Sequence, residues 1–488
     1  MISKSDIGSY IVSRVTTLKP TFDRPPNVRK ALGSLTVKQW MFFIVGYLGW
    51  AWDSCDFFSI SMTTTVLSEA FGKSSADITW GITLVLMFRS VGAVIFGLLG
   101  DRYGRKWPFI ACNVLFIILE LGTGFVQTYK QFLAVRALFG ICMGGLYGLA
   151  AATALEDVPA EARGLLSGIF QQGYAFGYLL ATVFARAFLP THYSWRAYFW
   201  FCGAPPVLII IFRLALPEND AFLRGNMTRV SGSESGNHFL TQAKVSFRKY
   251  WLTALYLTAL MAGMNFMAHG SQDLYPTLLQ EQYSFSEDAV TITQVVANLG
   301  AMVGATIAGY VSQIIGRRLT IIIVAIIGGA LLYPYSFVST KVVAVATFFE
   351  QACVLGIFGI APIHLMELSP APFRALIVGA SYQIGNLISS ASPTIEATLS
   401  ERFPLNRNGE TKQRYNYGLV VCLFMAAVYV YIIILTFIGP ERKDRDISST
   451  VEIMDSVDAC ESSGIETCHR VSTLGDQNKE LQSKGMKV

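Results

Sequence analysis

The sequence predicts an all-α membrane protein in which twelve transmembrane helices form two pseudo-symmetric six-helix bundles. Of its 488 residues, 52% are hydrophobic and only 15% are charged, whereas about 25% of the residues in a soluble domain are charged. The apolar residues are concentrated in long blocks, and motifs of the first half recur in the second half. These three observations predict the fold class.

The composition also excludes other classes of protein. Extended disorder requires low hydrophobicity, which this chain does not have. A net charge of +5 spread over 488 residues is too small an excess for the basic face of a nucleic-acid-binding protein. We therefore expect the lipid bilayer, and no nucleic acid, among its partners.

The apolar blocks fall into two groups of six, and each is close to the roughly 20 residues that a spanning helix needs. The blocks of the first group are 40–60, 78–99, 107–126, 131–154, 164–186 and 197–216. Those of the second group are 251–275, 289–312, 319–338, 342–366, 374–396 and 416–438. Two bundles follow, over residues 39–216 and 249–439.

Lys and Arg predict the orientation of these spans. They are concentrated in the segment 1–38, in the turn Asp101–Lys106, in the loop 217–248 and at Arg317 and Arg318. The opposite loops carry fewer, with one cluster near Arg402. Because cytoplasmic loops are enriched in positive residues, both termini are expected in the cytoplasm, including the polar tail 440–488.

The two halves contain matching motifs. Glu156 and Arg163, in a Glu-x-x-Pro-x-x-x-Arg-like segment, recur 211 residues later as Glu367 and Arg374. The turn Gly-x-x-x-Asp-Arg-x-Gly-Arg-Lys at 97–106 recurs 212 residues later, with Gln313 in place of Asp101. Two segments with nearly the same offset indicate duplication of a six-span unit, with the two copies related by an axis along the membrane normal.

These turns, the Glu and Arg pairs and the Arg-x-x-x-Gly-x-x-x-Gly motif at 136–144 resemble the major facilitator superfamily. The resemblance covers roughly residues 39–440 and implies a cytoplasmic gate whose ion pairs form in one conformation and separate in the other. The gate residues would be Asp101, Arg105, Glu156, Arg163, Glu367 and Arg374. Helix capping and charge topology alone are the simpler explanation of the same residues. Because Gln313 is uncharged, the gate of the second half should be the weaker one.

Charged residues inside a span are costly and usually face a cavity. The first four spans hold Asp53, Asp56, Arg89, Glu120 and Arg136. Arg89 is the preferred ligand of an anion, because a guanidinium matches a carboxylate with parallel N–H donors. A salt bridge between Arg89 and Asp53 or Asp56 is the alternative, and a substrate could displace it. Asp53, Asp56 and Arg136 are further candidates for proton coupling, whereas Glu350 and Glu396 lie near predicted span ends and are expected to be solvated.

The seventh span carries a polar stripe. Asn265, His269, Asp273 and Thr277 recur every four residues, which places them on one helical face, with Gln272 beside it. A polar face cannot point to lipid, so it lines the interior. His269 and Asp273 can share a hydrogen bond and hold a proton, while a cluster that only joins helices is the alternative.

This stretch resembles the signature of the fungal Jen-type lactate/pyruvate permeases, carboxylate–proton symporters of the same superfamily. The matching positions are Asn265, His269, Ser271, Gln272, Asp273 and Thr277, and Ala268 departs from the usual Ser or Thr. The resemblance implies that these six positions, with Gln383 and Asn386 of the eleventh span, contact the substrate. Ordinary hydrogen bonding between helices is the alternative for the last two.

The function that this resemblance implies is proton-coupled import of short-chain monocarboxylates across the plasma membrane, with lactate and pyruvate as substrates and acetate as a further candidate. The alternatives are a dicarboxylate (succinate or malate) symporter, with Arg136 as a second cationic partner, and a non-transporting nutrient sensor. No catalytic triad, nucleotide-binding turn or zinc spacing occurs, so we expect no enzyme activity, cofactor or metal. The tail offers Ser, Thr and Lys residues for a ubiquitin ligase or an arrestin-type adaptor, although a merely solvated tail is the simpler interpretation.

Overall fold

The computed structural model describes residues 10, 12–20, 27–73, 75–223, 236–370, 373–405 and 415–444. The tail segment 445–488, with its predicted modification and adaptor sites, lies outside the described residues, as do residues 224–235 of the central loop.

Helices form both halves of the described chain. After the short α2 (Val28–Gly33), the first half consists of α3 (Val37–Phe71), α4 (Ser75–Tyr103), α5 (Lys106–Phe125), α6 (Tyr129–Leu155), α7 (Ala160–Phe188), α8 (Ser194–Cys202) and α9 (Pro205–Ala215). The second half consists of α11 (Gly236–Gln272), α12 (Tyr275–Thr277), the π-helical turn η1 (Leu278–Gln282), α13 (Glu287–Ile315), α14 (Arg317–Phe337), α15 (Val343–Leu368), α16 (Arg374–Ser389), α17 (Ser392–Ser400) and α18 (Tyr417–Ile438).

Three predicted spans are broken. The sixth divides into α8 and α9 at Gly203 and Ala204, directly before Pro205 and Pro206. The seventh ends at Gln272, before Pro276, and the eleventh divides between Ser389 and Ser392, before Pro393. Each break precedes a proline, which lacks an N–H and disfavours helical backbone in the residue before it.

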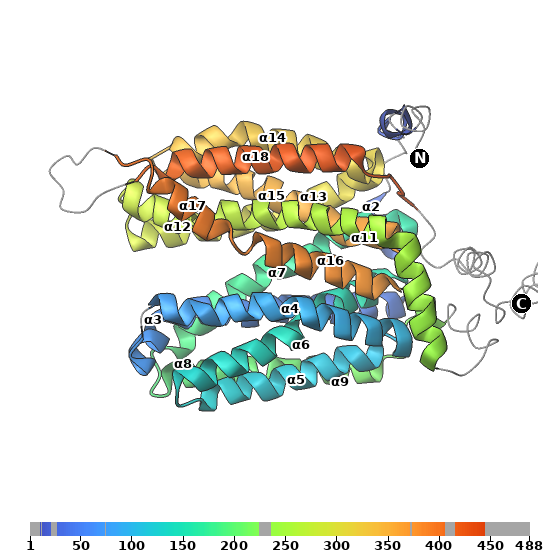
Figure 1. Cartoon of the computed structure of the whole chain (residues 1–488), viewed down its shortest axis with the longest axis horizontal. Coiled ribbons are helices and arrows are strands. Elements are labelled where there is room, and N and C mark those ends of the chain that lie inside the picture. Colours follow the sequence, from blue (N-terminus) through green and yellow to red (C-terminus); the bar gives the residue numbers. More distant parts are fainter. Residues whose placement is uncertain are drawn as a thin grey trace, which may run out of the picture.

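The helices form two bundles, as the sequence predicts. Figure 1 shows α3–α9 on one side of the molecule and α11–α18 on the other, with α7 and α16 near the junction. The junction is made by α7 against α13 and α15, and by α16 against α4 and α6. We call the end that holds the α4–α5, α6–α7 and α13–α14 turns the terminal face, because α2 and the end of α18 also lie there.

Nine helical segments of the described chain are long and apolar enough to cross a membrane. The other three of the twelve expected spans are α3, α7 and the pair α16–α17, and all three contribute residues to the cavity described below. Polar side chains that face the cavity lower the mean hydropathy of these helices, so their sequence signal is weaker.

Glycines allow equivalent helix pairs in the two halves to approach closely. A Cβ added to Gly144 of α6 would lie 1.9 Å from the carbonyl oxygen of Arg89 in α4. A Cβ added to Gly304 of α13 would lie 2.0 Å from the carbonyl oxygen of Ala352 in α15. Such close backbone contact is typical of membrane helices with small residues at the interface.

Candidate functional site

A cavity of about 550 Å³ lies between the two halves. Its walls come from α3, α4 and α7 of the first half and from α11, α13, α15, α17 and Ser390, directly after α16, of the second. Many lining residues, such as Ser61, Thr83, Tyr178 and Thr394, belong to the helical segments farthest from the terminal face. The cavity is therefore on the side of the molecule opposite the terminal face.

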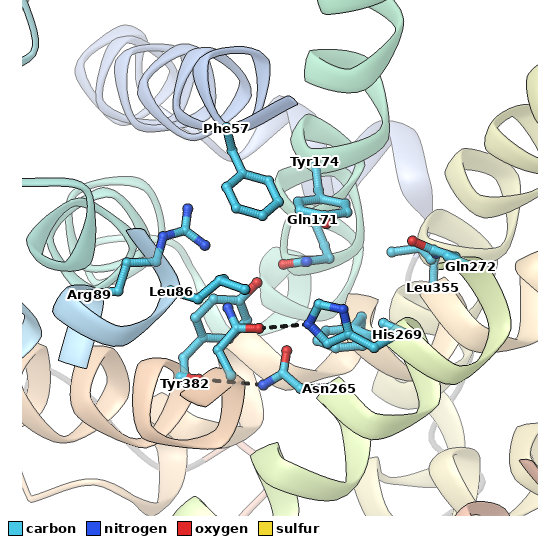
Figure 2. A pocket seen from close by; sticks show the side chains of 13 residues that line it. Phe57, Leu86, Arg89, Gln171, Tyr174, Asn265, His269, Gln272, Leu355 and Tyr382 are labelled. Carbon is cyan, nitrogen blue, oxygen red and sulfur yellow. Dashed lines mark hydrogen bonds between the residues drawn. The ribbon is translucent and has the colours of Figure 1, made fainter. Parts of the chain in front are cut away.

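The cavity continues into a smaller inner pocket with room for about one water molecule, about 20 Å³. Phe57, Leu86, Tyr174, His269 and Gln272 line both spaces. Figure 2 shows Arg89 on one side of the inner pocket and His269 on the other, with Gln171, Tyr382 and Asn265 around the space between them. Arg89 and His269 are the two basic side chains among the described lining residues.

Arg89 of α4 is 3% exposed and forms a buried ion pair. Its Nη2 atom lies 3.2 Å from Oδ2 of Asp53 in α3, and its guanidinium lies 4.9 Å from the centre of the Phe57 ring. Arg89 Nε and Asp53 Oδ1 have no hydrogen-bond partner among the described residues. One N–H donor of Arg89 and one carboxylate oxygen of Asp53 therefore remain available beside the pocket. A guanidinium with an available donor can bind a second carboxylate.

His269 of α11 lies within hydrogen-bonding distance of Asp273 of the predicted signature and of Asn386 in the eleventh span. Its Nδ1 lies 2.8 Å from Oδ2 of Asp273, and its Nε2 lies 3.1 Å from Oδ1 of Asn386 in α16. Asn265, one turn earlier, donates to the carbonyl of Met261 and, at 3.4 Å, to that of Tyr382. The side chain of Asp273 is 35% exposed, so the pair is in contact with the cavity and can exchange a proton with it.

Three predicted substrate contacts lie away from the described lining of the cavity. Ser271 is buried and donates to the carbonyl of Ala268 at 3.1 Å. Thr277 belongs to α12, after the break in the seventh span, so the four-residue stripe does not continue through it as one helix. Gln383 is buried behind Tyr382, and its amide has no hydrogen-bond partner in the part of the chain that the structure describes.

Aromatic residues that the sequence did not single out separate the inner pocket from the terminal face. The rings of Tyr147 in α6 and Tyr382 in α16 stack with centroids 4.0 Å apart. Trp50 of α3 packs edge-on against both, at 4.8 and 5.9 Å. Tyrosine and tryptophan in apolar spans look like ordinary packing residues, so nothing in the sequence distinguished this cluster.

Buried acids lie in both halves. Glu120 and Arg136 form an ion pair of 3.0 Å, and the Asp56 carboxylate nearby has no hydrogen-bond partner among the described residues. The expectation that Glu350 and Glu396 are solvated is wrong, because both are fully buried. Neighbouring helices cover both side chains: Tyr429 of α18 donates to Glu350 at 2.7 Å, and Glu396 packs against Gly270 of α11.

At the terminal face, the gate residues of both halves form matching ion pairs. Arg105 contacts both carboxylate oxygens of Glu156, at 3.2 and 2.9 Å, and Arg317 contacts those of Glu367 at 3.2 and 3.0 Å. Asp101 lies 3.2 Å from Arg105. These bidentate pairs are internal to each half and repeat the duplication seen in the sequence.

Other contacts of the gate residues cross between the halves. Arg374 lies 3.8 Å from Glu156, so it pairs with the acid of the opposite half, while Arg163 donates to the carbonyl of Val158 at 3.0 Å. Asp101 accepts from the N–H groups of Ala375 and Leu376, at 3.2 and 2.9 Å. Its counterpart Gln313 accepts from the N–H of Gly164, at 3.2 Å. Polar side chains of each half thus accept hydrogen bonds from a helix of the other half.

Two further acids at the terminal face were missed. Glu218 accepts from the N–H groups of Arg105 and Lys106 at the start of α5, both at 3.0 Å, and Glu441 accepts from the N–H of Arg318 at the start of α14 at 2.9 Å. Burial raises the pKa of Glu441, while its hydrogen bond from the Arg318 N–H opposes this rise. Both acids follow a proline, in Leu-Pro-Glu and Gly-Pro-Glu, and this shared pattern was the available signal.

Two bundles with a cavity open at one end and ion pairs closing the other define a membrane transporter. The chain resembles solved structures of the proton:xylose symporter XylE of E. coli. One, bound to 6-bromo-6-deoxy-D-glucose, gives a TM-score of 0.68 at 18% identity, over 86% of this chain and 99% of that one. A partially occluded inward-open structure gives 0.60, over 84% and 100%. At this identity the likeness shows the fold alone.

A family model described as "Sugar (and other) transporter" matches residues 27–452. The chain belongs to this family, whose members are transporters and not enzymes. It is 38% identical to a "Carboxylic acid transporter protein homolog" of Saccharomyces cerevisiae, over 99% of this chain and 82% of that protein. It is 28% identical to a "Probable 4-methylmuconolactone transporter" of Cupriavidus pinatubonensis, over 74% and 83%, and 26% identical to a "Cis,cis-muconate transport protein" of Acinetobacter baylyi, over 75% and 88%.

Proposed function

We propose that this protein is a proton-coupled symporter of the Jen type, which imports short-chain monocarboxylates such as lactate, pyruvate and acetate across the plasma membrane. The observation that carries the proposal is the pair of basic side chains, Arg89 and His269, on opposite sides of the inner pocket. The name of the yeast relative, a carboxylic acid transporter protein homolog, agrees with an organic-acid substrate.

Arg89 binds the carboxylate in this proposal. Asp53 neutralises the guanidinium at 3.2 Å. The substrate carboxylate competes with Asp53 for the same donors, so that a buried positive charge is never left without a partner. Such an exchange lowers the cost of holding a charge within the membrane.

The His269–Asp273 pair carries the proton. It lies at the cavity, within hydrogen-bonding distance of Asn386 on the facing helix. A protonated His269 adds positive charge across the pocket from Arg89 and favours binding of the anion. By linkage, the bound anion then favours protonation to the same extent. If this pair does not carry the proton, the next candidates for proton coupling are Asp53, Asp56 and Arg136.

The terminal face is cytoplasmic in this proposal, since the positively charged segments of the sequence lie there. The cavity then opens to the outside, and the structure corresponds to an outward-facing state. Asp101, Arg105, Glu156 and Arg374 keep the cytoplasmic side closed, with Glu367 and Arg163 as the matching residues of the repeat.

A dicarboxylate substrate is the second candidate. Two basic lining residues and about 550 Å³ of space could accommodate an acid with two carboxylates. The Acinetobacter relative named for cis,cis-muconate transport also favours such a substrate. Arg136 does not serve as the second partner here, because it pairs with Glu120 and is not among the lining residues. A non-transporting nutrient sensor would keep the cavity but accumulate nothing.

One experiment separates these functions. The protein is expressed in cells that lack carboxylate uptake, and entry of labelled lactate, pyruvate, acetate and succinate is measured at several pH values. We expect uptake of the monocarboxylates that rises as the external pH falls. Uptake of succinate in preference to lactate would favour the hypothesis of a dicarboxylate symporter. Binding of a carboxylate without its uptake would favour the hypothesis of a nutrient sensor.

A further inference from the structure

Glu396 of α17 is a buried acid to which neither the gate nor the proposed substrate site assigns a role. Its side chain is fully buried, and neither carboxylate oxygen has a hydrogen-bond partner among the described residues. None of the described residues forms a salt bridge with Glu396. A carboxylate without a cation or hydrogen bonds is costly to bury, and the usual outcome is a neutral, protonated acid.

The position of Glu396 connects it to the proposed proton site. Its Oε1 atom lies 3.0 Å from the place of a Cβ on Gly270, the residue that follows His269 in α11. Pro393 and Thr394, on the same short helix, line the cavity, whereas Glu396 points into the protein. Glu396 thus lies directly behind the part of α11 that carries His269.

Among the described residues, no Lys or Arg forms an ion pair with Glu396, and His269 is bonded to its neighbour Asp273. Asp273, the residue directly after α11, is a charged neighbour of Glu396 and is acidic. Tyr335 of α14 is its other titratable neighbour, and α18 presents the ring of Phe424 on the same side of Gly270. Two carboxylates close together do not both ionise readily, so the protonation of Glu396 depends on that of the His269–Asp273 pair.

We propose that Glu396 is a second proton-binding site of the transport cycle, neutral in the outward-facing state and coupled to the His269–Asp273 pair. The ligand is a proton, bound at a carboxylate oxygen as an O–H bond and released as H⁺ when the carrier changes conformation. This inference rests on the proposed proton symport and adds a residue to it. When the His269–Asp273 pair gives up its proton, the negative charge near Glu396 increases. This increase favours binding of a proton by Glu396.

Glu396→Gln tests the idea, because glutamine has almost the same shape and is permanently neutral. Glu350→Gln is the matched control. Glu350 is a second fully buried acid in the same half, but its Oε1 accepts a hydrogen bond of 2.7 Å from Tyr429, whereas neither oxygen of Glu396 has a partner among the described residues. Both variants need surface amounts equal to those of the wild-type protein.

The first measurement is infrared spectroscopy of the purified protein at neutral pH, in the band of protonated carboxyl groups. We expect wild-type protein to show a component that Glu396→Gln lacks and that changes when lactate is added. The same band in both proteins would mean that Glu396 is ionised, and would overturn the proposal. This readout does not depend on transport.

The second measurement is pH-driven accumulation of lactate beside lactate counterflow, which needs no net proton movement. Glu396→Gln should reduce accumulation about tenfold or more while counterflow stays within about twofold, because only the proton step is lost. Accumulation at the level of wild type and Glu350→Gln would show that Glu396 is a structural neutral acid and would overturn the proposal. If wild-type protein accumulates no organic acid at all, the proposed function fails, and the infrared result still decides whether Glu396 binds a proton.

Discussion

The carboxylate of Asp101, at the end of α4, accepts hydrogen bonds from the N–H groups of Ala375 and Leu376, in the first turn of α16. An aspartate thus caps a helix, but the helix belongs to the opposite half of the molecule. The first N–H groups of a helix have no partner within it, and the helix dipole favours a negative charge there. The contact therefore stabilises only conformations in which the two halves meet at the terminal face.

Asp101→Asn is expected to weaken this closure. The amide keeps the shape but removes the charge, and hydrogen bonds to a charged acceptor contribute about 1.5–3 kcal/mol. A loss of about 1.4 kcal/mol shifts the equilibrium between the two states about tenfold towards the inward-open form. Labelling of single cysteines placed at either end of the cavity measures this shift. Equal labelling of variant and parent proteins would contradict the prediction.

Arg89→Lys should raise the KM for lactate about tenfold or more, because lysine keeps the charge but loses the planar pair of donors. The measurement is initial uptake at several lactate concentrations, normalised to surface protein. Arg186→Lys, an exposed arginine of α7, is the control and should be unchanged. Normal uptake by Arg89→Ala would remove Arg89 from the binding site.

Asp53→Asn tests whether the substrate displaces the internal salt bridge. Asparagine removes the competing charge that lies 3.2 Å from Arg89, so lactate binding should tighten by several-fold, about 1 kcal/mol. Binding of labelled lactate to purified protein is the measurement. Weaker binding by Asp53→Asn would mean that Asp53 positions Arg89 instead of competing for it.

His269→Ala and Asp273→Asn should each abolish proton-coupled accumulation, while carboxylate exchange partly survives. Asn265→Ala should weaken binding more than coupling, because an amide does not titrate. Lactate-driven alkalinisation of the medium, measured beside lactate counterflow, separates the two effects. If both variants accumulate lactate with wild-type pH dependence, the proton is carried elsewhere, and Asp53 or Asp56 becomes the next candidate.

Gly144→Ala should destabilise the protein, because the new methyl group would lie 1.9 Å from the carbonyl oxygen of Arg89. Overpacking of this kind costs about 1–3 kcal/mol, so the thermal midpoint of the purified protein should fall by several degrees. Gly122→Ala in α5 is the matched control, since no atom lies within 4 Å of its added Cβ. Equal midpoints for the two variants would contradict the close packing of α4 and α6.

The sequence by itself determined the fold class, because apolar blocks of spanning length and a repeated motif are local properties that can be counted along the chain. It also placed His269 beside Asp273, since residues four apart share a helical face. It did not determine where that face ends: the break after Gln272 separates Thr277 from the stripe.

Only the tertiary structure decided which groups on different helices meet. The pairing of Arg89 with Asp53, of Arg374 with Glu156 and of Asp101 with α16 joins residues from 36 to 275 positions apart. The tertiary structure also decided the environment of Glu396. Its position near a predicted span end suggested exposure to solvent, but its packing against Gly270 buries it. The physical reason is that burial and charge pairing depend on neighbouring helices, and the spacing of residues within one helix carries no information about which helix lies beside it.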